Sequence, residues 1–262
     1  MQLTVDGNGV YAYTASRKFD PLLPAVFFVH GAGLDHSVWA LQSRYFAHHG
    51  WNALAMDLPG HGRSGGEALS SVSSIAEWVI RVMDAAGIAR AMLIGHSMGS
   101  LAALEAAGRH PERVTRVALL APSVPMPVSD GLLAAARAND HAAYELITEW
   151  SFSPNHQTGG NQQPGVWMTG NALRLMERLR PGVLYVDLSA CNSYADGLAA
   201  ARRVRCPALV ILGERDRMAP ARGAKELIST LTDSKVVTLA DTGHSLMVEH
   251  PDAVLDALRK FL

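Results

Sequence analysis

Short, continuous runs of apolar residues recur along the chain, with segments of helical periodicity between them. Strands that are apolar at every position are buried on both faces, which is typical of a parallel sheet covered by helices on each side. The runs are Ala25–Val29, Ala53–Met56, Ala91–Ile94, Val114–Leu120, Ala208–Leu212 and Val236–Leu239. This alternation predicts an α/β fold with right-handed crossover connections.

Two further segments fit this organisation. Between residues 70 and 87, one helical stripe is formed by Ile75, Val79, Val82 and Ala86. Before the first apolar run, residues 3–14 alternate around Asp6-Gly7-Asn8-Gly9, which predicts an antiparallel hairpin at the start of the chain.

The alternation of strands and helices lapses between residues 124 and 203. This stretch contains helical pieces interrupted at Pro154, Gly159-Gly160 and Pro181-Gly182, and it is too long for a plain loop. We interpret 124–203 as a helical cap inserted into a core domain formed by 1–123 and 204–262. Three of its residues are candidates for lining a pocket, although each would equally suit the interior of the cap: Met126, Trp150 and Trp167.

Bulk properties exclude several classes of function. The chain has 262 residues, is 48% hydrophobic and carries a formal net charge of −1, so it has apolar residues for a sizeable core and no electrostatic footprint for nucleic acid. No apolar run approaches the roughly 18 residues that a membrane span needs. The N-terminus lacks a signal-peptide pattern, and we expect a cytoplasmic protein. The sequence leaves its oligomeric state, monomer or dimer, open.

The cysteines and histidines show no metal-binding spacing. Cys191 and Cys206 form no C-x-x-C pair, so two free thiols are expected, and neither a metal nor a cofactor is predicted. The 11 histidines are scattered. Most fall in turns or at helix boundaries, and His36, His141 and His156 suit surface or cap positions.

A candidate nucleophile follows the apolar run Ala91–Ile94. The pentapeptide Gly95-His96-Ser97-Met98-Gly99 matches G-x-S-x-G, a spacing that is weak evidence alone but informative between a buried strand and a strong helix former. A sharp strand-to-helix turn would project the hydroxyl of Ser97 above the sheet. The start of the following helix favours developing negative charge at the same place.

A serine hydroxyl needs a base to remove its proton, and the base needs a carboxylate to orient it. His244 follows the last apolar run, and Asp216 follows the run before it. Both should therefore lie at the carboxyl edge of the sheet, near Ser97. Glu214 is the nearest competitor for the acid but is expected to serve the turn, and Asp241 suits a local loop bond or helix cap.

The negative charge that develops on a carbonyl oxygen needs backbone donors. The N–H of Met98, directly after the serine, is one candidate. The other is the N–H of Ala32 in His30-Gly31-Ala32-Gly33, which we call the oxyanion loop, because its small residues allow close approach to a ligand.

Five motifs in this order resemble the α/β-hydrolase fold superfamily. They are the oxyanion loop, Asp57-Leu58-Pro59-Gly60-His61-Gly62-Arg63-Ser64, the serine pentapeptide, Gly213-Glu214-Arg215-Asp216 and Gly243-His244. The resemblance covers nearly the whole chain and is weakest over 124–203. It implies a mostly parallel eight-stranded sheet flanked by helices, with a helical cap insertion. The Asp57–Ser64 turn has only a structural role in that comparison.

The resemblance also implies a two-step acyl transfer, with a carboxylesterase of small or medium esters as the leading expectation. A lactonase, a C–C bond hydrolase of ring-cleavage products, and a cofactor-free oxygenase or lyase stay open. A small-molecule receptor with slow turnover is the alternative from another class. If the protein is a hydrolase, its expected partner is a small-molecule ester or lactone.

Overall fold

The computed structural model describes residues 1–160 and 165–262, and its centre is one eight-stranded sheet. The strands are β1 (Gln2–Val5), β2 (Asn8–Tyr13), β3 (Ala25–Val29), β4 (Asn52–Met56), β5 (Ala91–His96), β6 (Val114–Leu120), β7 (Ala208–Gly213) and β8 (Ser234–Leu239). Their order is β1-β2-β4-β3-β5-β6-β7-β8. The β1–β2 and β2–β4 pairs are antiparallel, whereas the pairs from β4 to β8 are all parallel. The predicted fold class is confirmed.

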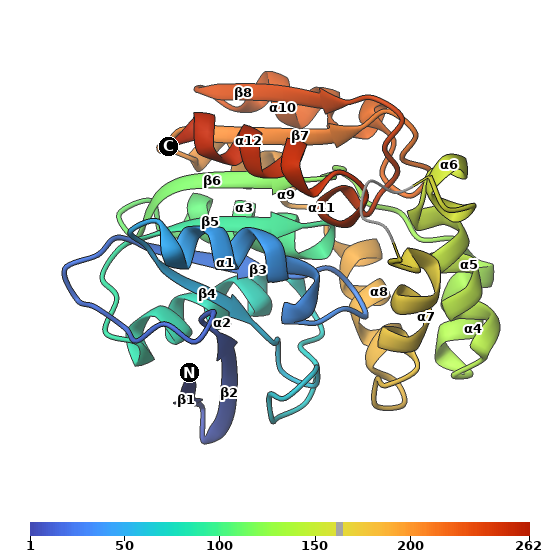
Figure 1. Cartoon of the computed structure of the whole chain (residues 1–262), viewed down its shortest axis with the longest axis horizontal. Coiled ribbons are helices and arrows are strands. Elements are labelled where there is room, and N and C mark those ends of the chain that lie inside the picture. The colour runs from blue at the N-terminus through green and yellow to red at the C-terminus, as the bar shows by residue number, and fades with distance from the viewer. Residues whose placement is uncertain (161–164) are drawn as a thin grey trace.

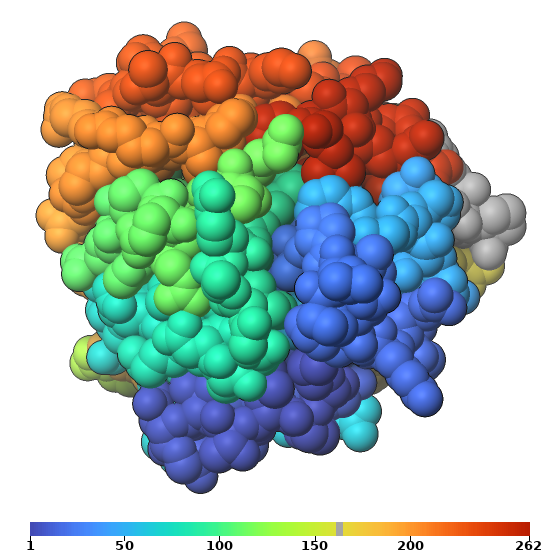
Figure 2. Space-filling view, turned by 90° about the vertical axis from the view of Figure 1, so that its left-hand side faces the viewer, coloured from blue at the N-terminus to red at the C-terminus, as the bar shows by residue number. Residues whose placement is uncertain are grey.

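Helices cover both faces of the sheet (Figure 1). In front lie α1 (Ala40–His48) and α12 (Pro251–Phe261). Behind it lie α2 (Val72–Ala85), α3 (Met98–Arg109) and α10 (Lys225–Thr230). Two short 3-10 helices, η1 (His36–Trp39) and η2 (Ala221–Ala224), and the short α11 (Leu246–Glu249) complete these layers. Figure 2, seen from the side, shows the N-terminal hairpin at one margin of the molecule and the last strands at the other.

The continuous apolar runs are explained by this three-layer arrangement. Along β3, Phe27 packs into the core on the α2–α3 side, and Phe28 packs into the core on the α1–α12 side. In β5, Leu93 and Ile94 divide in the same way. Successive side chains of a strand point to opposite faces, so a strand covered on both sides buries every residue.

One apolar run departs from this rule. The segment predicted as Val236–Leu239 is the edge strand β8, and Val236 is 45% exposed. Because β8 pairs with β7 alone, one flank of the strand and part of its face lie open. Apolar composition therefore overstated the burial of this strand.

Local sequence signals account for the turn of the first hairpin and for the two ends of α2. Asp6 and Gly7 both have positive φ, at 52° and 77°, as a tight hairpin turn requires. Helix α2 begins with a capping box between Ser71 and Ser74. It is followed by Gly87, whose φ of 68° is the left-handed conformation typical of a helix stop.

Five helices gather at the carboxyl ends of the parallel strands (Figure 1). They are α4 (Asp130–Arg137), α5 (His141–Ser151), α6 (Pro154–Gln157), α7 (Met168–Met176) and α8 (Val183–Ser193). Four of them, α4, α5, α7 and α8, share an apolar cluster of their own, which includes Leu132, Ile147, Met176, Leu184 and Leu188. This packing is what a cap would show. We call α4–α8 the cap helices, and the division of the chain into core and cap stays a prediction.

The last helix of the predicted insertion packs differently. Helix α9 (Gly197–Arg203) lies against α3 rather than among α4–α8. The approach is close, because a Cβ on Gly108 would lie only 2.6 Å from the carbonyl oxygen of Ala200. Glycine at position 108 thus lets α9 pack closely against α3, in the layer of helices behind the sheet.

Two further expectations concern the thiols and the membrane. Cys191 and Cys206 are unpaired, and burial raises the pKa of both thiols. Among residues 1–160 and 165–262, no helix has the length and apolar character to cross a bilayer.

Candidate active site

The turn between β5 and α3 holds Ser97 in a strained conformation. Ser97 has φ 53° and ψ −121°, a region that costs a residue other than glycine about 1–3 kcal/mol. Its N–H donates to the carbonyl oxygen of Leu120 at 2.9 Å, which ties the turn to β6. Helix α3 begins at Met98, so N–H groups that lack an acceptor within the helix lie next to Ser97.

Glycines permit this turn because neighbouring backbone leaves no room for a side chain. A Cβ on Gly95 would lie 2.0 Å from the carbonyl oxygen of Gly99, and one on Gly99 would lie 2.3 Å from that of Val29. A Cβ on Gly31 would lie 3.1 Å from the Cβ of Ser97. The oxyanion loop is therefore packed directly against the serine.

The strain at Ser97 predicts that the protein is more stable with glycine at this position. We expect Ser97→Gly to raise the free energy of unfolding by about 1 kcal/mol, which corresponds to a rise of roughly 2–4 °C in the midpoint of thermal unfolding. Circular dichroism measures this directly. Ser229→Gly, at an exposed position in α10 with ordinary helical geometry, is the matched control and should lower the midpoint. A lower midpoint for Ser97→Gly would show that the turn stores no strain.

His244 and Asp216 form a buried pair at the same edge of the sheet. The Nδ1 of His244 lies 2.8 Å from Oδ2 of Asp216, and the other oxygen, Oδ1, accepts the N–H groups of Met218 and Ala219 at 2.9 and 2.8 Å. Burial alone would raise the pKa of Asp216, but the charge and hydrogen bond of His244 and these two donors lower it below its usual value. The carboxylate thus accepts from Nδ1–H, and Nε2 is the ring nitrogen of His244 that Asp216 does not contact.

The competing acids have other partners. Glu214 accepts the N–H of Asp241 at 3.0 Å through Oε2, the turn role that was expected of it. Asp241 accepts from the side-chain amide of Asn155. Gly213 allows the loop after β7 to lie close to the loop after β8. A Cβ at this position would lie only 2.2 Å from the carbonyl oxygen of Gly243.

Ser97 and His244 both line a cavity of about 250 Å³, as does Ala32 of the oxyanion loop. Most of its wall is apolar and comes from the oxyanion loop region and from the cap helices and their connections: Leu34, Met126, Leu132, Ile147, Met176 and Leu188. Such a wall suits the hydrocarbon part of a small ligand. Met98, directly after Ser97, is fully buried and is not among the residues that line the cavity.

Two of the three candidate pocket residues lie at the cavity, and the third does not. Met126 and Trp150 line the cavity. Trp167 lies outside it and is 67% exposed. Its indole ring lies over Gly170 in the first turn of α7, where a Cβ would come within 2.2 Å of the ring. Packing on its own helix, rather than on a ligand, explains this aromatic residue.

Two contacts that sequence analysis missed hold the backbone of His244. The Nε2–H of His96 donates to the carbonyl oxygen of His244 at 2.8 Å. Burial, and then the nearby His244, lower the pKa of His96 to about 3, so that its ring is neutral. From the other side, the carbonyl oxygen of Ser151 accepts the N–H groups of His244 and Ser245 at 2.8 and 3.0 Å.

A buried glutamate supports the same loop. Oε2 of Glu249 accepts the N–H of Gly243 at 3.1 Å and that of Ser153 at 2.9 Å. The ring of His156 lies beside it, with Nδ1 2.7 Å from Oγ of Ser153. The prediction that His156 is a surface or cap residue was wrong, because α6 packs it inward and leaves it 5% exposed.

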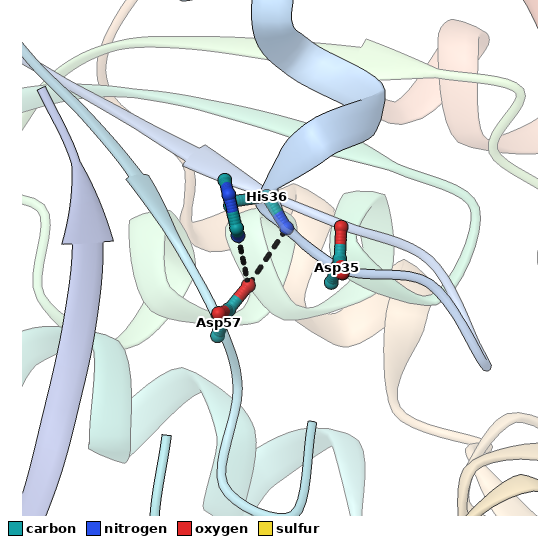
Figure 3. Close-up of side chains that lie close together, drawn as sticks. All are labelled: Asp35, His36 and Asp57. Atoms are coloured by element: carbon teal, nitrogen blue, oxygen red, sulfur yellow. Dashed lines mark hydrogen bonds and ion pairs between the residues drawn. The ribbon is translucent and has the colours of Figure 1, made fainter. Parts of the chain in front are cut away.

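One group of side chains in the described part of the chain has metal-binding geometry, and Figure 3 shows it. Oδ1 of Asp57 accepts from N–H and Nδ1 of His36 at 2.8 and 2.7 Å, and Oδ2 accepts the N–H of Arg63 at 2.8 Å. Asp35 accepts the N–H of Ser37 at 2.8 Å. Because these oxygens already hold the turn together, we interpret the group as structural.

This geometry can be compared with known proteins. Residues 24–251 match the family described as alpha/beta hydrolase fold. The chain belongs to this family. A pimeloyl-[acyl-carrier protein] methyl ester esterase of Chromobacterium violaceum is 31% identical over 91% of this chain and 94% of its own. A 2-hydroxy-6-oxo-6-phenylhexa-2,4-dienoate hydrolase of Burkholderia cepacia is 27% identical over 87% of this chain and 84% of its own.

The fold is also shared with solved structures of the family. The enol-lactonase from Burkholderia xenovorans superimposes with a TM-score of 0.87 at 24% identity and covers 100% of this chain and 99% of its own. The relatives thus include a methyl ester esterase and a dienoate hydrolase, and an enol-lactonase shares the fold. The protein is an α/β-hydrolase, and its substrate must be argued from the site.

Proposed function

We propose that the protein is a serine hydrolase that cleaves carboxylic esters of small or medium size, with Ser97 as nucleophile, His244 as base and Asp216 as the acid behind it. The observation that carries the proposal is the buried hydrogen bond of 2.8 Å between His244 and Asp216, which leaves the free ring nitrogen in a cavity that also contains Ser97.

The reaction divides into two steps. In the first, Nε2 of His244 takes the proton of Ser97 while Oγ attacks the ester carbonyl carbon, and the N–H groups of Met98 and Ala32 stabilise the oxygen that becomes negative. His244 then protonates the departing alcohol, which leaves an acyl group on Ser97. In the second step, His244 takes a proton from water as the water oxygen attacks the acyl carbon; the bond from this carbon to Oγ of Ser97 then breaks, His244 returns the proton to Oγ, and the carboxylic acid departs.

One observation favours a small or medium substrate, and another favours an ester. The cavity volume of about 250 Å³ lies just below the range for small-molecule sites, roughly 300–1,000 Å³. The relative from Chromobacterium violaceum, which is similar over nearly the whole chain, is named as a pimeloyl-[acyl-carrier protein] methyl ester esterase, and this supports ester cleavage. A bulky acyl chain would need the cap helices to move apart.

We expect steady multiple turnover on short-chain p-nitrophenyl esters, because His244 can serve both acylation and deacylation. Activity should fall for long acyl chains that the cavity cannot hold. Initial rates and burst amplitudes across a panel of esters, lactones and ring-cleavage dienones measure this, with Ser97→Ala as the blank. One burst equal to the enzyme concentration would support a receptor with slow turnover. Turnover of lactones or dienones alone would assign the other hydrolase chemistries.

A further inference from the structure

A second buried histidine–carboxylate pair lies next to the oxyanion loop. Nε2 of His61 is 2.8 Å from Oδ2 of Asp187, and both side chains are 1% exposed. The same oxygen accepts the N–H of Gly33 at 2.9 Å. Asp187 belongs to α8, a cap helix, and His61 belongs to the turn after β4. One carboxylate oxygen therefore joins the cap, this turn and the oxyanion loop.

The hydrogen-bond partners define the protonation of His61. Its Nδ1 lies 3.0 Å from the carbonyl oxygen of Pro59, and its Nε2 faces Asp187. Both partners only accept, so both ring nitrogens carry a proton and the ring is an imidazolium. Burial alone would lower the pKa of His61, but the charge and hydrogen bond of Asp187 outweigh it and raise the pKa above its usual value. The positive ring compensates the buried carboxylate.

His30, whose ring centroid lies 4.9 Å from that of His61, has the opposite protonation. Its Nδ1–H donates to the carbonyl oxygen of Gly31 at 2.8 Å, and its Nε2 accepts the N–H of Leu58 at 3.1 Å. One nitrogen donates and the other accepts, so the ring is neutral. Burial, and then the positive His61, lower the pKa of His30 to about 4.

These contacts fix the two peptide groups on either side of Ala32. The peptide between Gly31 and Ala32 is planar, so anchoring its carbonyl oxygen to His30 directs the N–H of Ala32 the opposite way. The next peptide is anchored by its own N–H, which Gly33 donates to Asp187. With both planes held, the backbone at Ala32 has little freedom to rotate.

Helix α8 also packs onto the loop. A Cβ on Gly33, which has φ +67°, would lie 3.1 Å from Cδ1 of Leu184. Leu188 and Cys191 of the same helix line the cavity. Helix α8 therefore both lines the cavity and contacts the oxyanion loop.

We propose that Asp187, paired with His61, is a positioning residue that holds the oxyanion loop so that the N–H of Ala32 faces the substrate carbonyl oxygen. This inference rests on the proposed function, because it assigns Ala32 to the oxyanion site. Asp187 touches neither the substrate nor the reacting atoms. It acts through Gly33, and it makes the catalytic geometry depend on the placement of the cap helix α8.

The test compares Asp187→Ala and Asp187→Asn with the wild-type protein on a short p-nitrophenyl ester. Asp187→Ala should lower kcat about 10- to 100-fold and leave KM within about threefold, because a displaced donor weakens the transition state more than substrate binding. Asp187→Asn keeps an oxygen for Gly33 and should recover part of the loss. A boronic acid, whose tetrahedral adduct places an oxygen at the same site, should bind Asp187→Ala more weakly by a similar factor.

Tyr194→Phe is the matched control. Tyr194 follows the same helix, α8, and its hydroxyl donates to Oε2 of the buried Glu105 on α3 at 2.6 Å. Removing this hydroxyl also breaks a buried hydrogen bond between α3 and the end of α8, yet among the described residues Tyr194 forms no hydrogen bond or ion pair with the oxyanion loop, so kcat should stay within about twofold. Equal losses of kcat in Asp187→Ala and Tyr194→Phe would overturn the proposal, as would an unchanged kcat in Asp187→Ala.

Hydrogen exchange supplies a readout that needs no substrate. Amide exchange across residues 30–34 should accelerate in Asp187→Ala and stay unchanged in Tyr194→Phe, and His61→Gln offers the same comparison if Asp187→Ala fails to fold. Unchanged exchange in an Asp187 or His61 variant would overturn the positioning role. Faster exchange in a protein without esterase turnover would instead overturn the proposed function and retain the anchoring of the loop.

Discussion

Ser97→Ala should lower kcat on any turned-over ester at least about a thousandfold, because the nucleophile and its base act as a unit. The methyl group of alanine fits the same turn, so the fold should be retained. Steady-state kinetics and circular dichroism on the same preparation measure both effects.

Ser43→Ala is the matched control for this substitution. Ser43 is a buried serine on α1 that does not line the cavity, and its hydroxyl has no hydrogen-bond partner among the described residues, so the kcat of Ser43→Ala should match that of the wild type. Retained activity in Ser97→Ala would remove the serine from the mechanism, and parallel losses in both variants would indicate that impaired folding is the cause.

The juxtaposition of Ser97, Asp216 and His244 was predictable because it follows from local pattern and topology together. Each residue comes shortly after a segment whose apolar composition identifies it as a strand of the sheet. Parallel strands end at a common edge, so residues that follow different strands meet there. The roles assigned to the three residues remain predictions; Ser97→Ala tests the nucleophile, and Asp216→Asn tests the pair that Asp216 forms with His244.

The pair of His61 and Asp187 was not predictable in the same way. The two residues are 126 positions apart, and Asp187 lies in a helix of the cap, where a single acidic residue in an irregular pattern suggests a solvated face. Which face of α8 turns toward the oxyanion loop depends on how the cap docks. Nothing in the local sequence encodes that docking.

Trp167 and β8 show the opposite error, in which apolar character was taken as a sign of burial. An aromatic residue can pack on its own helix, as Trp167 does over Gly170. A strand such as Ser234–Leu239 can lie at the edge of a sheet, where several of its residues are exposed. Periodicity identifies the element, but its position in the sheet decides its burial.

Asp216→Asn should lower kcat by about 10³- to 10⁴-fold, and the hydrogen bonds of the native carboxylate explain why. Oδ1 accepts two N–H groups, from Met218 and Ala219, so the amide oxygen of an asparagine must take that place. Its NH₂ group then faces Nδ1 of His244 as a donor. His244 can accept only by moving its proton to Nε2, and it is then unable to take the proton of Ser97.

Glu214→Gln tests the competing acid in the same loop. Its amide oxygen can still accept the N–H of Asp241, the contact that Oε2 of Glu214 makes at 3.0 Å, so kcat should stay within about threefold of the wild type. Measuring kcat and KM for both variants on one ester separates the two acids. If Glu214→Gln lost more activity than Asp216→Asn, the carboxylate behind His244 would have to be reassigned, because the tautomer argument applies only to the acid that His244 contacts during turnover.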